Sequence, residues 1–373
     1  MTSTHTDIDS KARKALEGTK FEVLELNKIT GGSVNWIYQA QLVEPLENGE
    51  KEVLVKHGEP YMASKPEFAL PPLRCVIETE SLKILSSDSS FDNTPKETHG
   101  FVVRTPKLYH FDQASSTQIL EFMSDGIHLK DYAIQNYGSP TPDSFKPQCQ
   151  ELGKAVGRWL RDFVTWSAQQ IKHRDLVAQN EFGQAVRHMV NYAWLHERIK
   201  EYPSILKDAK DILAQVAQMA AAEKDDIDKL QIIHGDFWTG NVVLPNVAIE
   251  EGKEIPVFVV DWEMTQLGLT SVDFGQMIAE MYALWLYKSA DAGLWMMKGF
   301  IEGYGDISED FAFRTAVHVG THLVCVTTDF PAWGRENFEG VVKVGRDIIV
   351  HAWKKDREWF ETGELASLFR SEN

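Results

Sequence analysis

The chain has 373 residues, 43% of them hydrophobic and 25% charged, which is typical of a soluble globular protein with room for two lobes. Its 55 acidic residues outnumber its 38 lysines and arginines, so the formal net charge is −17, and no block of basic residues occurs. This charge argues against nucleic acid and anionic membranes as partners. It leaves open either a solvated acidic surface or attraction of a cationic substrate.

The residue pattern in the N-terminal part of the chain predicts a polar segment followed by an antiparallel sheet. Residues 1–20 form a mixed-charge lead, with a helix expected from Ser10 onward. Alternation of apolar and polar residues then predicts three antiparallel strands. These strands cover residues 21–26, 36–42 and 52–57.

The turn before the second strand and the end of the third strand carry candidate phosphate-binding residues. The turn contains Gly31, Gly32, Ser33 and Asn35. Glycines let backbone N–H groups approach phosphates closely, although an ordinary hairpin turn accounts for a glycine pair equally well. At the end of the third strand, Lys56 is placed to hold the phosphates of a nucleotide.

A helix is predicted from Leu73 to Ser86, and it offers a partner for this lysine. Glu78 shares the stripe at i, i+4 and i+7 with Leu82 and Leu85, so Glu78 faces inward. An ion pair with Glu78 would fix the direction of Lys56. The alternative is a surface glutamate near a helix end.

The character of the pattern changes near Ser124-Asp125-Gly126, where we expect the lobe boundary. Strand patterns precede it at 101–104, 107–111 and 118–123, and mostly helical patterns follow. We therefore expect an α+β fold with a lead at 1–20, a sheet-rich lobe at 21–124 and a helical lobe at 125–373. The helices are expected at 147–170, 181–200, 204–223, 273–289, 291–304, 308–328 and 337–356.

The segment from Ile232 to Asn241 has the pattern of a phosphoryl-transfer loop. An apolar pair leads into His234-Gly235-Asp236, and Asn241 follows five positions after the aspartate. A strand pattern at 256–260 then ends in Asp261-Trp262-Glu263. Phosphoryl transfer needs one carboxylate to orient the attacking hydroxyl and oxygen ligands to hold Mg2+. The order and spacing of these pieces indicate that chemistry.

The three cysteines, Cys75, Cys149 and Cys325, lie far apart and show no metal-type spacing. This usage favours a reducing compartment, with the thiols as buried small hydrophobes. Residues 1–20 lack an apolar signal region, and no apolar run approaches the ~18 residues of a membrane span. We therefore expect a cytoplasmic location. No feature of the sequence indicates an oligomeric state.

These motifs resemble the aminoglycoside phosphotransferase/choline kinase superfamily, whose loop is His-Gly-Asp with asparagine five residues after the aspartate. Asp261-Trp262-Glu263 is similar to the Asp-x-Glu of its methylthioribose kinase-like branch, and the sequence resembles the fungal 4-hydroxytryptamine kinases more closely than it resembles methylthioribose kinase. The resemblance spans residues ~20–355. It implies a two-lobed protein-kinase-like fold, with an antiparallel sheet and one helix in the N-lobe, and a kinase that uses ATP and Mg2+.

The resemblance also implies roles for individual residues. Asp236 would be the catalytic base, and His234 and Asp273 would be structural, with Asp273 bracing the loop. Mg2+ would be held by Asn241, Asp261 and Glu263. The nucleotide would be bound by the glycine turn, by Lys56 with Glu78, and by backbone groups of Glu121 and Met123.

The acceptor is expected to be a small-molecule alcohol, with an amino alcohol or a hydroxyindole amine as the specific hypothesis. Trp238 and Trp333 could hold an ammonium by cation–π contact, and Asp329 could pair with it. Asn241 and the absence of adjacent arginines depart from the methylthioribose kinase pattern. The alternatives are methylthioribose or another sugar, a protein kinase, and a catalytically inactive nucleotide-binding scaffold.

Overall fold

The structure is a computed structural model, and it describes residues 2–29, 32–87, 100–250, 252–329 and 333–369. The chain forms two compact units that interleave in sequence. Unit 1 comprises residues 1–92, 105–126 and 260–264, and unit 2 comprises residues 93–104, 127–259 and 265–373. The sequence pattern placed a single boundary near residue 124, whereas Asp261-Trp262-Glu263 belongs to the unit that contains Lys56.

Unit 1 is built on a five-stranded antiparallel sheet with the strand order β1-β2-β3-β8-β7. The three strands predicted at the N-terminus are confirmed as neighbours in this sheet. A separate ladder of two short strands, β4 and β5, was not predicted. The bounds are β1 Val23–Lys28, β2 Trp36–Leu42, β3 Glu52–His57, β4 Tyr61–Met62, β5 Lys65–Ala69, β7 Leu108–Asp112 and β8 Thr117–Glu121.

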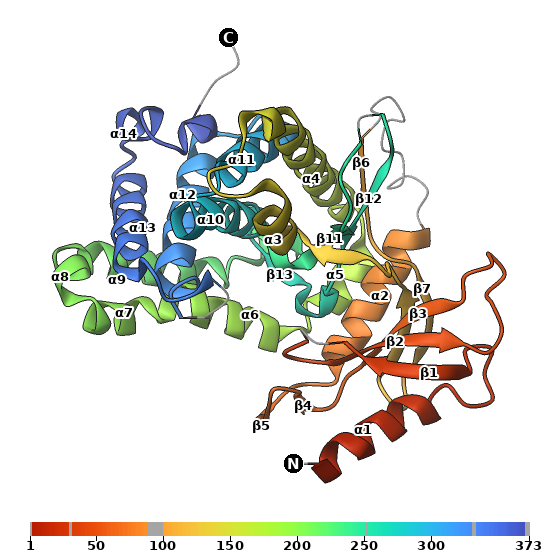
Figure 1. The fold of residues 1–373 in the computed structure, drawn as a ribbon. Coiled ribbons are helices and arrows are strands. Elements are labelled where there is room, and N and C mark those ends of the chain that lie inside the picture. The colour runs from red at the N-terminus through yellow and green to blue at the C-terminus, as the bar shows by residue number, and fades with distance from the viewer. Residues whose placement is uncertain (1, 30–31, 88–99, 251, 330–332, 370–373) are drawn as a thin grey trace. The chain divides into compact units, whose positions relative to one another are not determined.

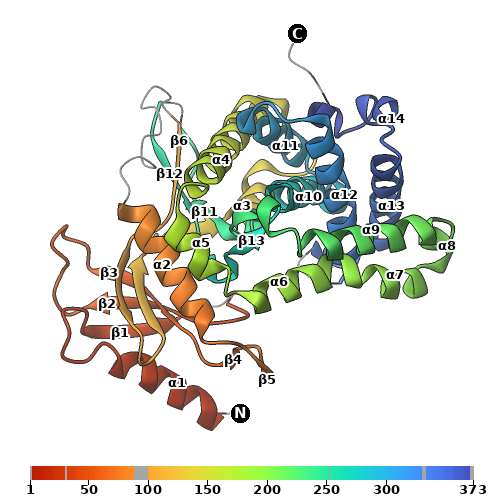
Figure 2. The ribbon, with the colours of Figure 1, turned by 180° about the vertical axis from the view of Figure 1, so that it is seen from behind.

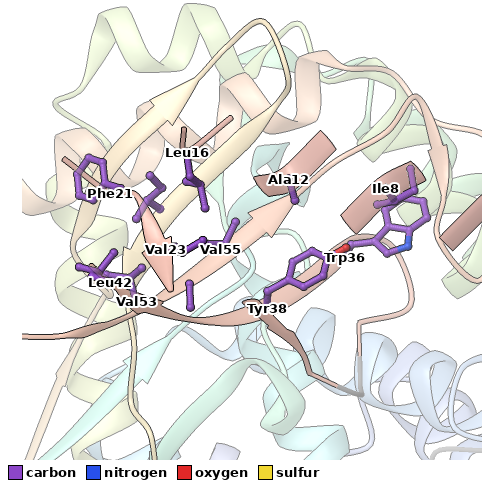
Figure 3. Packing of buried hydrophobic residues seen from close by; sticks show 12 residues of the cluster. Ile8, Ala12, Leu16, Phe21, Val23, Trp36, Tyr38, Leu42, Val53 and Val55 are labelled. Atoms are coloured by element: carbon purple, nitrogen blue, oxygen red, sulfur yellow. The ribbon is translucent and has the colours of Figure 1, made fainter. Parts of the chain in front are cut away.

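Helix α1 (Thr2–Lys14) covers one face of this sheet. Figure 3 shows its Ile8 and Ala12, together with Leu16, packed against side chains of the strands, including Val53 and Val55 of β3. The expected start at Ser10 was wrong. The apolar stripe with a spacing of four residues begins at Ile8, so the helix must begin earlier to bury it.

Helix α2 (Leu73–Ser87) covers the opposite face. Val53 and Val55 of β3 pack on the α1 side of the sheet. Because side chains alternate along a strand, the residues next to them in sequence point away from α1. Leu54 and Lys56 therefore face α2, as does Gln118 of β8, whose Nε2 donates to Thr79 Oγ1 at 2.9 Å. The strand thus directs Lys56 toward the helix that carries Glu78.

Unit 2 is mostly helical and contains a four-stranded sheet in the order β6-β12-β11-β9 and a two-stranded ladder of β10 with β13. Strand β6 (Phe101–Arg104) pairs in parallel with β12, so this segment does not join the N-terminal sheet as expected. The other bounds are β9 Gly126–His128, β10 Gln231–Ile233, β11 Val242–Pro245, β12 Ile255–Val259 and β13 Gln266–Gly268.

The predicted helices of unit 2 are confirmed, with two interruptions. A π-helical segment at Met189–Ala193 divides the helix expected at 181–200, and a 3-10 turn at Lys207–Ala209 divides the one at 204–223. The bounds are α3 Leu129–Tyr132, α4 Lys146–Ser167, α5 Ile171–Val177, α6 Glu181–His188, α7 Leu195–Glu201, α8 Pro203–Leu206, α9 Lys210–Glu223, α10 Thr270–Lys288, α11 Asp291–Tyr304, α12 Glu309–Cys325, α13 Phe338–Trp353 and α14 Arg357–Glu361.

Helices α4 and α11 cross with their backbones in contact (Figures 1 and 2). A Cβ on Gly153 or Gly157 of α4 would lie 2.1 Å from a carbonyl oxygen of α11. A Cβ on Gly299 or Gly303 of α11 would meet α4 carbonyl oxygens at 2.1 and 2.2 Å. Only glycine permits this approach, and the spacing of four places each pair on one helix face.

The α+β prediction is confirmed, with an antiparallel sheet and helix in the N-terminal unit and a mostly helical second unit. The three cysteines are buried free thiols, and burial raises the pKa of Cys75 to about 11. Across the residues that the structure describes, none of the helices is both long and apolar enough to cross a membrane.

Candidate active site

The His234-Gly235-Asp236 loop of unit 2 is anchored by its backbone. Strands β10 and β13 pair antiparallel and deliver the loop, and Gly235 has a φ of +81°, which favours glycine. Asp273 of α10 accepts hydrogen bonds from the N–H groups of His234 at 2.6 Å and Gly235 at 3.0 Å. The N–H of Asp236 donates to Nδ1 of His234 at 3.2 Å. The loop conformation is therefore fixed on both sides of Gly235.

The Asp236 carboxylate is held at both oxygens. Asn241 Nδ2 donates to Oδ2 at 3.1 Å and to the Asp236 carbonyl at 2.9 Å. Gln276 Nε2 donates to Oδ1 at 3.0 Å, and Arg187 Nη1 lies 3.6 Å from the same oxygen. The side chain still has 35% of its surface exposed, so it is both oriented and accessible to a ligand.

Asp273 differs from Asp236 in its environment. It is 1% exposed, and burial raises its pKa to about 6, although Arg187 and the two backbone N–H groups lower it. A carboxylate in this position accepts bonds that the loop backbone needs, since buried N–H groups without partners are costly. Its geometry is that of a brace for the loop.

In unit 1, Lys56 connects the sheet with α2 and with Asp261. Its Nζ lies 2.7 Å from Glu78 Oε1 and 2.5 Å from Asp261 Oδ1. Burial alone lowers the pKa of Lys56, yet the carboxylates of Asp261, Glu78 and Glu263 outweigh it and raise the pKa. For Glu78, burial is the larger effect and raises its pKa, although Lys56 lowers it. Glu78 also accepts a hydrogen bond from the N–H of Trp262 at 3.1 Å, which fixes the Asp-Trp-Glu segment on α2.

Asp261 itself has a φ of +68°, in the left-handed region that few residues other than glycine adopt. Aspartate is one of the residues that tolerate this conformation, and such strain is concentrated at functional sites. Its side chain is 38% exposed, more than those of Lys56 and Glu78. The backbone thus presents this carboxylate to solvent.

Glu263 is buried against Arg74, which donates to its Oε2, and Asn35 Nδ2 donates to the same oxygen at 3.0 Å. Arg74 Nη1 also donates to Asn35 Oδ1 at 2.5 Å. Ligand oxygens of Glu78, Asp261 and Glu263 lie within 4.8 Å of one another. Three carboxylates face two cations, so the cluster carries surplus negative charge. Hard oxygen ligands of this kind suit Mg2+.

Of the remaining predicted nucleotide-binding residues, Gly32 and Ser33 precede β2, Glu121 ends β8, and Met123 follows β8. Gly31 lies outside the described residues, and Gly32 and Ser33 are exposed. The N–H of Glu121, at the end of β8, donates to the carbonyl of Lys107 at 2.8 Å. The carbonyl of Met123 accepts from the N–H of Gly126 at 2.9 Å. These two backbone groups already have partners within unit 1.

Two of the three predicted substrate residues lie near a common cation. Lys130 Nζ is 5.8 Å from the ring centroid of Trp238 and 5.0 Å from that of Trp333. Asp329 is held instead by Arg198 Nη2 at 2.5 Å. The carboxylate that contacts Trp333 is Glu280, which accepts from the indole N–H at 3.1 Å.

The sequence analysis assigned no role to four residues that contact these groups. Gln276 lies three residues after Asp273 on the same helix face, so the helical period could have indicated it. Arg74 precedes Glu78 by four residues, and together with Glu78 it belongs to the segments that resemble the family, but its contacts with Asn35 and Glu263 were not predicted. Arg187 and Lys130 lie in distant segments, and no spacing connects them to the loop.

This loop and carboxylate geometry is that of a phosphotransferase, and comparison with protein families agrees. A model of the phosphotransferase enzyme family matches residues 96–312, more than half of the chain. The chain belongs to the phosphotransferase enzyme family. The methylthioribose kinase-like branch stays a prediction.

Known relatives cover nearly the whole chain. The phosphotransferase FrzJ of Cladobotryum sp is 27% identical over 92% of this chain and 91% of its own. The 4-hydroxytryptamine kinase of Psilocybe cubensis is 23% identical over 93% of this chain and 92% of its own. A solved structure of spectinomycin phosphotransferase with ADP and spectinomycin covers 94% of this chain and 93% of that one, with 14% identity and a TM-score of 0.44.

Proposed function

We propose that this phosphotransferase moves the γ-phosphoryl group of ATP to a hydroxyl of a small molecule. The acceptor oxygen attacks the γ-phosphorus, the bond from that phosphorus to the bridging oxygen breaks, and ADP leaves. Asp236 orients the hydroxyl and accepts its proton. The observation that carries this proposal is the Asp236 carboxylate, held at both oxygens yet 35% exposed.

The nucleotide and metal roles are part of the same proposal. Lys56, directed by Glu78, binds ATP phosphates, together with the glycine turn and backbone groups near Glu121 and Met123. Asn241, Asp261 and Glu263 are the proposed Mg2+ ligands. Mg2+ supplies neutralisation of phosphate charge when it is bound. The surplus of carboxylates around Lys56 and Arg74 supports a site that takes a cation.

For the acceptor, we propose an amino alcohol or a hydroxyindole amine. The names of two relatives, the net charge of −17 and the pair Trp238 and Trp333 support an amine. Asp329, which is paired with Arg198, remains the proposed ammonium partner, and Glu280 is a second carboxylate beside Trp333. Glu280 is buried, and its oxygens accept from Trp333 and contact His322 Nε2 at 2.7 Å. Lys130 makes the cation–π contacts in the free protein, so an ammonium must compete with it.

A coupled assay of ADP release tests the function across amino alcohols, hydroxyindole amines, sugars and thiosugars. Asp236→Asn should lose nearly all turnover and still bind ATP, whereas Asp175→Asn, an exposed aspartate on α5, should behave as wild type. Full activity of Asp236→Asn would refute the proposed mechanism. Turnover of neutral sugars alone would refute the amine acceptor, and ADP release no faster with any acceptor than without one would favour an inactive scaffold.

A further inference from the structure

Two residues outside the loop contact the Oδ1 atom of Asp236. Gln276 comes from α10 and Arg187 from the last turn of α6. Both are buried, with exposures of 3% and 9%. The two side chains also contact each other, since Arg187 Nη2 donates to Gln276 Oε1. The three residues form a closed set of contacts around one carboxylate oxygen.

The chemistry of these groups permits only one orientation of the Gln276 amide. An arginine side chain has donors and no acceptor, and an ionised carboxylate has acceptors and no donor. An amide between them must therefore turn its oxygen to Arg187 and its NH2 group to Asp236. Because Arg187 holds the amide oxygen of Gln276, the NH2 group of Gln276 must donate to the Asp236 carboxylate.

Arg187 also supplies a buried positive charge between two acids. Its Nη1 is 3.6 Å from Asp236 Oδ1, and its charge lowers the pKa of Asp273 against the effect of burial. Carboxylates of this kind repel each other unless a cation lies near both. Arg187 is thus linked to the reacting carboxylate and to the brace beneath it.

We propose that Arg187 and Gln276 are positioning residues that set the orientation of Asp236 for attack by the acceptor. Asn241 fixes Oδ2 and the Arg187–Gln276 pair fixes Oδ1, so the carboxylate cannot rotate about its χ2 bond without losing a charge-assisted hydrogen bond. This inference rests on the proposed role of Asp236 in catalysis. The proposal expects that loss of either residue lowers kcat and leaves the binding of ATP and of the acceptor unchanged.

The first test replaces the Gln276 amide either by a carboxylate or by an apolar group. Gln276→Glu keeps an oxygen for Arg187 but has no N–H for Asp236 and adds a repelling charge. Gln276→Met removes both functions. Both should lower kcat about ten- to hundredfold, the value of one hydrogen bond to a charged group, with the KM for ATP and acceptor unchanged. Gln169→Glu, an exposed glutamine, makes the same charge change and should leave kcat unchanged.

The Arg187 variants test the connection between the two residues. Arg187→Met should lower kcat, and the double variant with Gln276→Met should lose no more than the larger single loss, because the pair acts as a unit. Gln276→Glu should keep the thermal midpoint of the wild type, because the glutamate can still contact Arg187. A lower kcat in this variant would then not result from unfolding. An unchanged kcat in Gln276→Glu, additive losses, or an effect confined to the acceptor KM would overturn the proposal.

A spectroscopic readout keeps the test independent of turnover. In protein labelled with 15N-glutamine, the side-chain resonance of Gln276 is identified by its absence in Gln276→Met. It should shift in Asp236→Asn and in Arg187→Met, and not in Asp175→Asn. If no acceptor is turned over, the proposed function fails while this contact remains measurable. A resonance unaffected by both changes would refute the positioning contact itself.

Discussion

Asp273 accepts two backbone hydrogen bonds from the His234-Gly235-Asp236 loop, so its replacement should destabilise the protein measurably. Replacing Asp273 by Asn keeps the size of the side chain but leaves one oxygen where two N–H groups, those of His234 and Gly235, now donate. The amide NH2 group would face one of these donors. A buried N–H left without an acceptor costs about 1–3 kcal/mol. We expect Asp273→Asn to lower the free energy of unfolding by about that amount at pH 8, where the Asp273 carboxyl is ionised, and to lower kcat through the displaced loop.

The effect should depend on pH, because the pKa of Asp273 is raised to about 6. A carboxyl with a raised pKa binds its proton more tightly in the folded state, so its stabilising contribution is largest at low pH and is lost as pH rises through 6. From pH 5 to pH 8 this loss is on the order of 1 kcal/mol for a buried group. Asn does not titrate, so the deficit of Asp273→Asn should be larger at pH 5 than at pH 8.

Urea unfolding of both proteins at pH 5 and pH 8, with linear extrapolation, measures these differences. Asp175→Asn serves as the control because Asp175 is an exposed aspartate in the same unit. A variant as stable as wild type at both values would show that the two N–H groups do not depend on Asp273. A deficit that grows from pH 5 to pH 8 would contradict the direction of the pKa shift.

Three further changes have defined outcomes. Lys56→Met should abolish most ATP turnover and lower the urea unfolding free energy by about 3 kcal/mol, because Glu78 loses its buried partner; retained turnover would contradict the role of the lysine. Lys130→Met should lower the KM of an amine acceptor by removing a competing cation, and a higher KM would argue against the tryptophan site. Gly157→Ala should lower the thermal midpoint and should lower the free energy of unfolding by about 1–3 kcal/mol. Gly363→Ala should change neither, because the nearest atoms to its added Cβ lie at 3.8 Å.

Much of the fold could be predicted because its elements have strong periodic patterns. The strands at 36–42 and 52–57 and the helix at 291–304 have the expected bounds. Strand β6 was assigned to the wrong sheet, because its partner β12 lies far along the chain and pairing over such a separation has no local signal. The interruption of the helix expected at 181–200 was missed because a π-helical segment keeps a helical pattern of apolar residues.

The site shows the same division between local and long-range information. Motif and spacing predicted roles for the loop residues and Asp261, which stay predictions. The predicted pairing of Lys56 with Glu78, which follows from strand alternation and helical period, is present in the structure. Asp329 was proposed as an ammonium partner because of its charge, but nothing in the sequence indicates its ion pair with Arg198. Arg187 was missed for the same reason. Which ions pair inside a helical unit depends on tertiary contacts that single-sequence patterns do not encode.

The crossing of α4 and α11 has a consequence for how this enzyme can change over evolution. Phe237, beside Asp236, packs against Trp159 of α4 and Phe300 of α11, with ring centroids 5.8 and 6.4 Å apart. The four glycines leave no side chain at the crossing that could change its rotamer to accommodate a shift. If the residues around Lys130 and Trp333 bind the acceptor as proposed, substitutions that change the acceptor are expected there, while the packing of Phe237 on α4 and α11 stays the same.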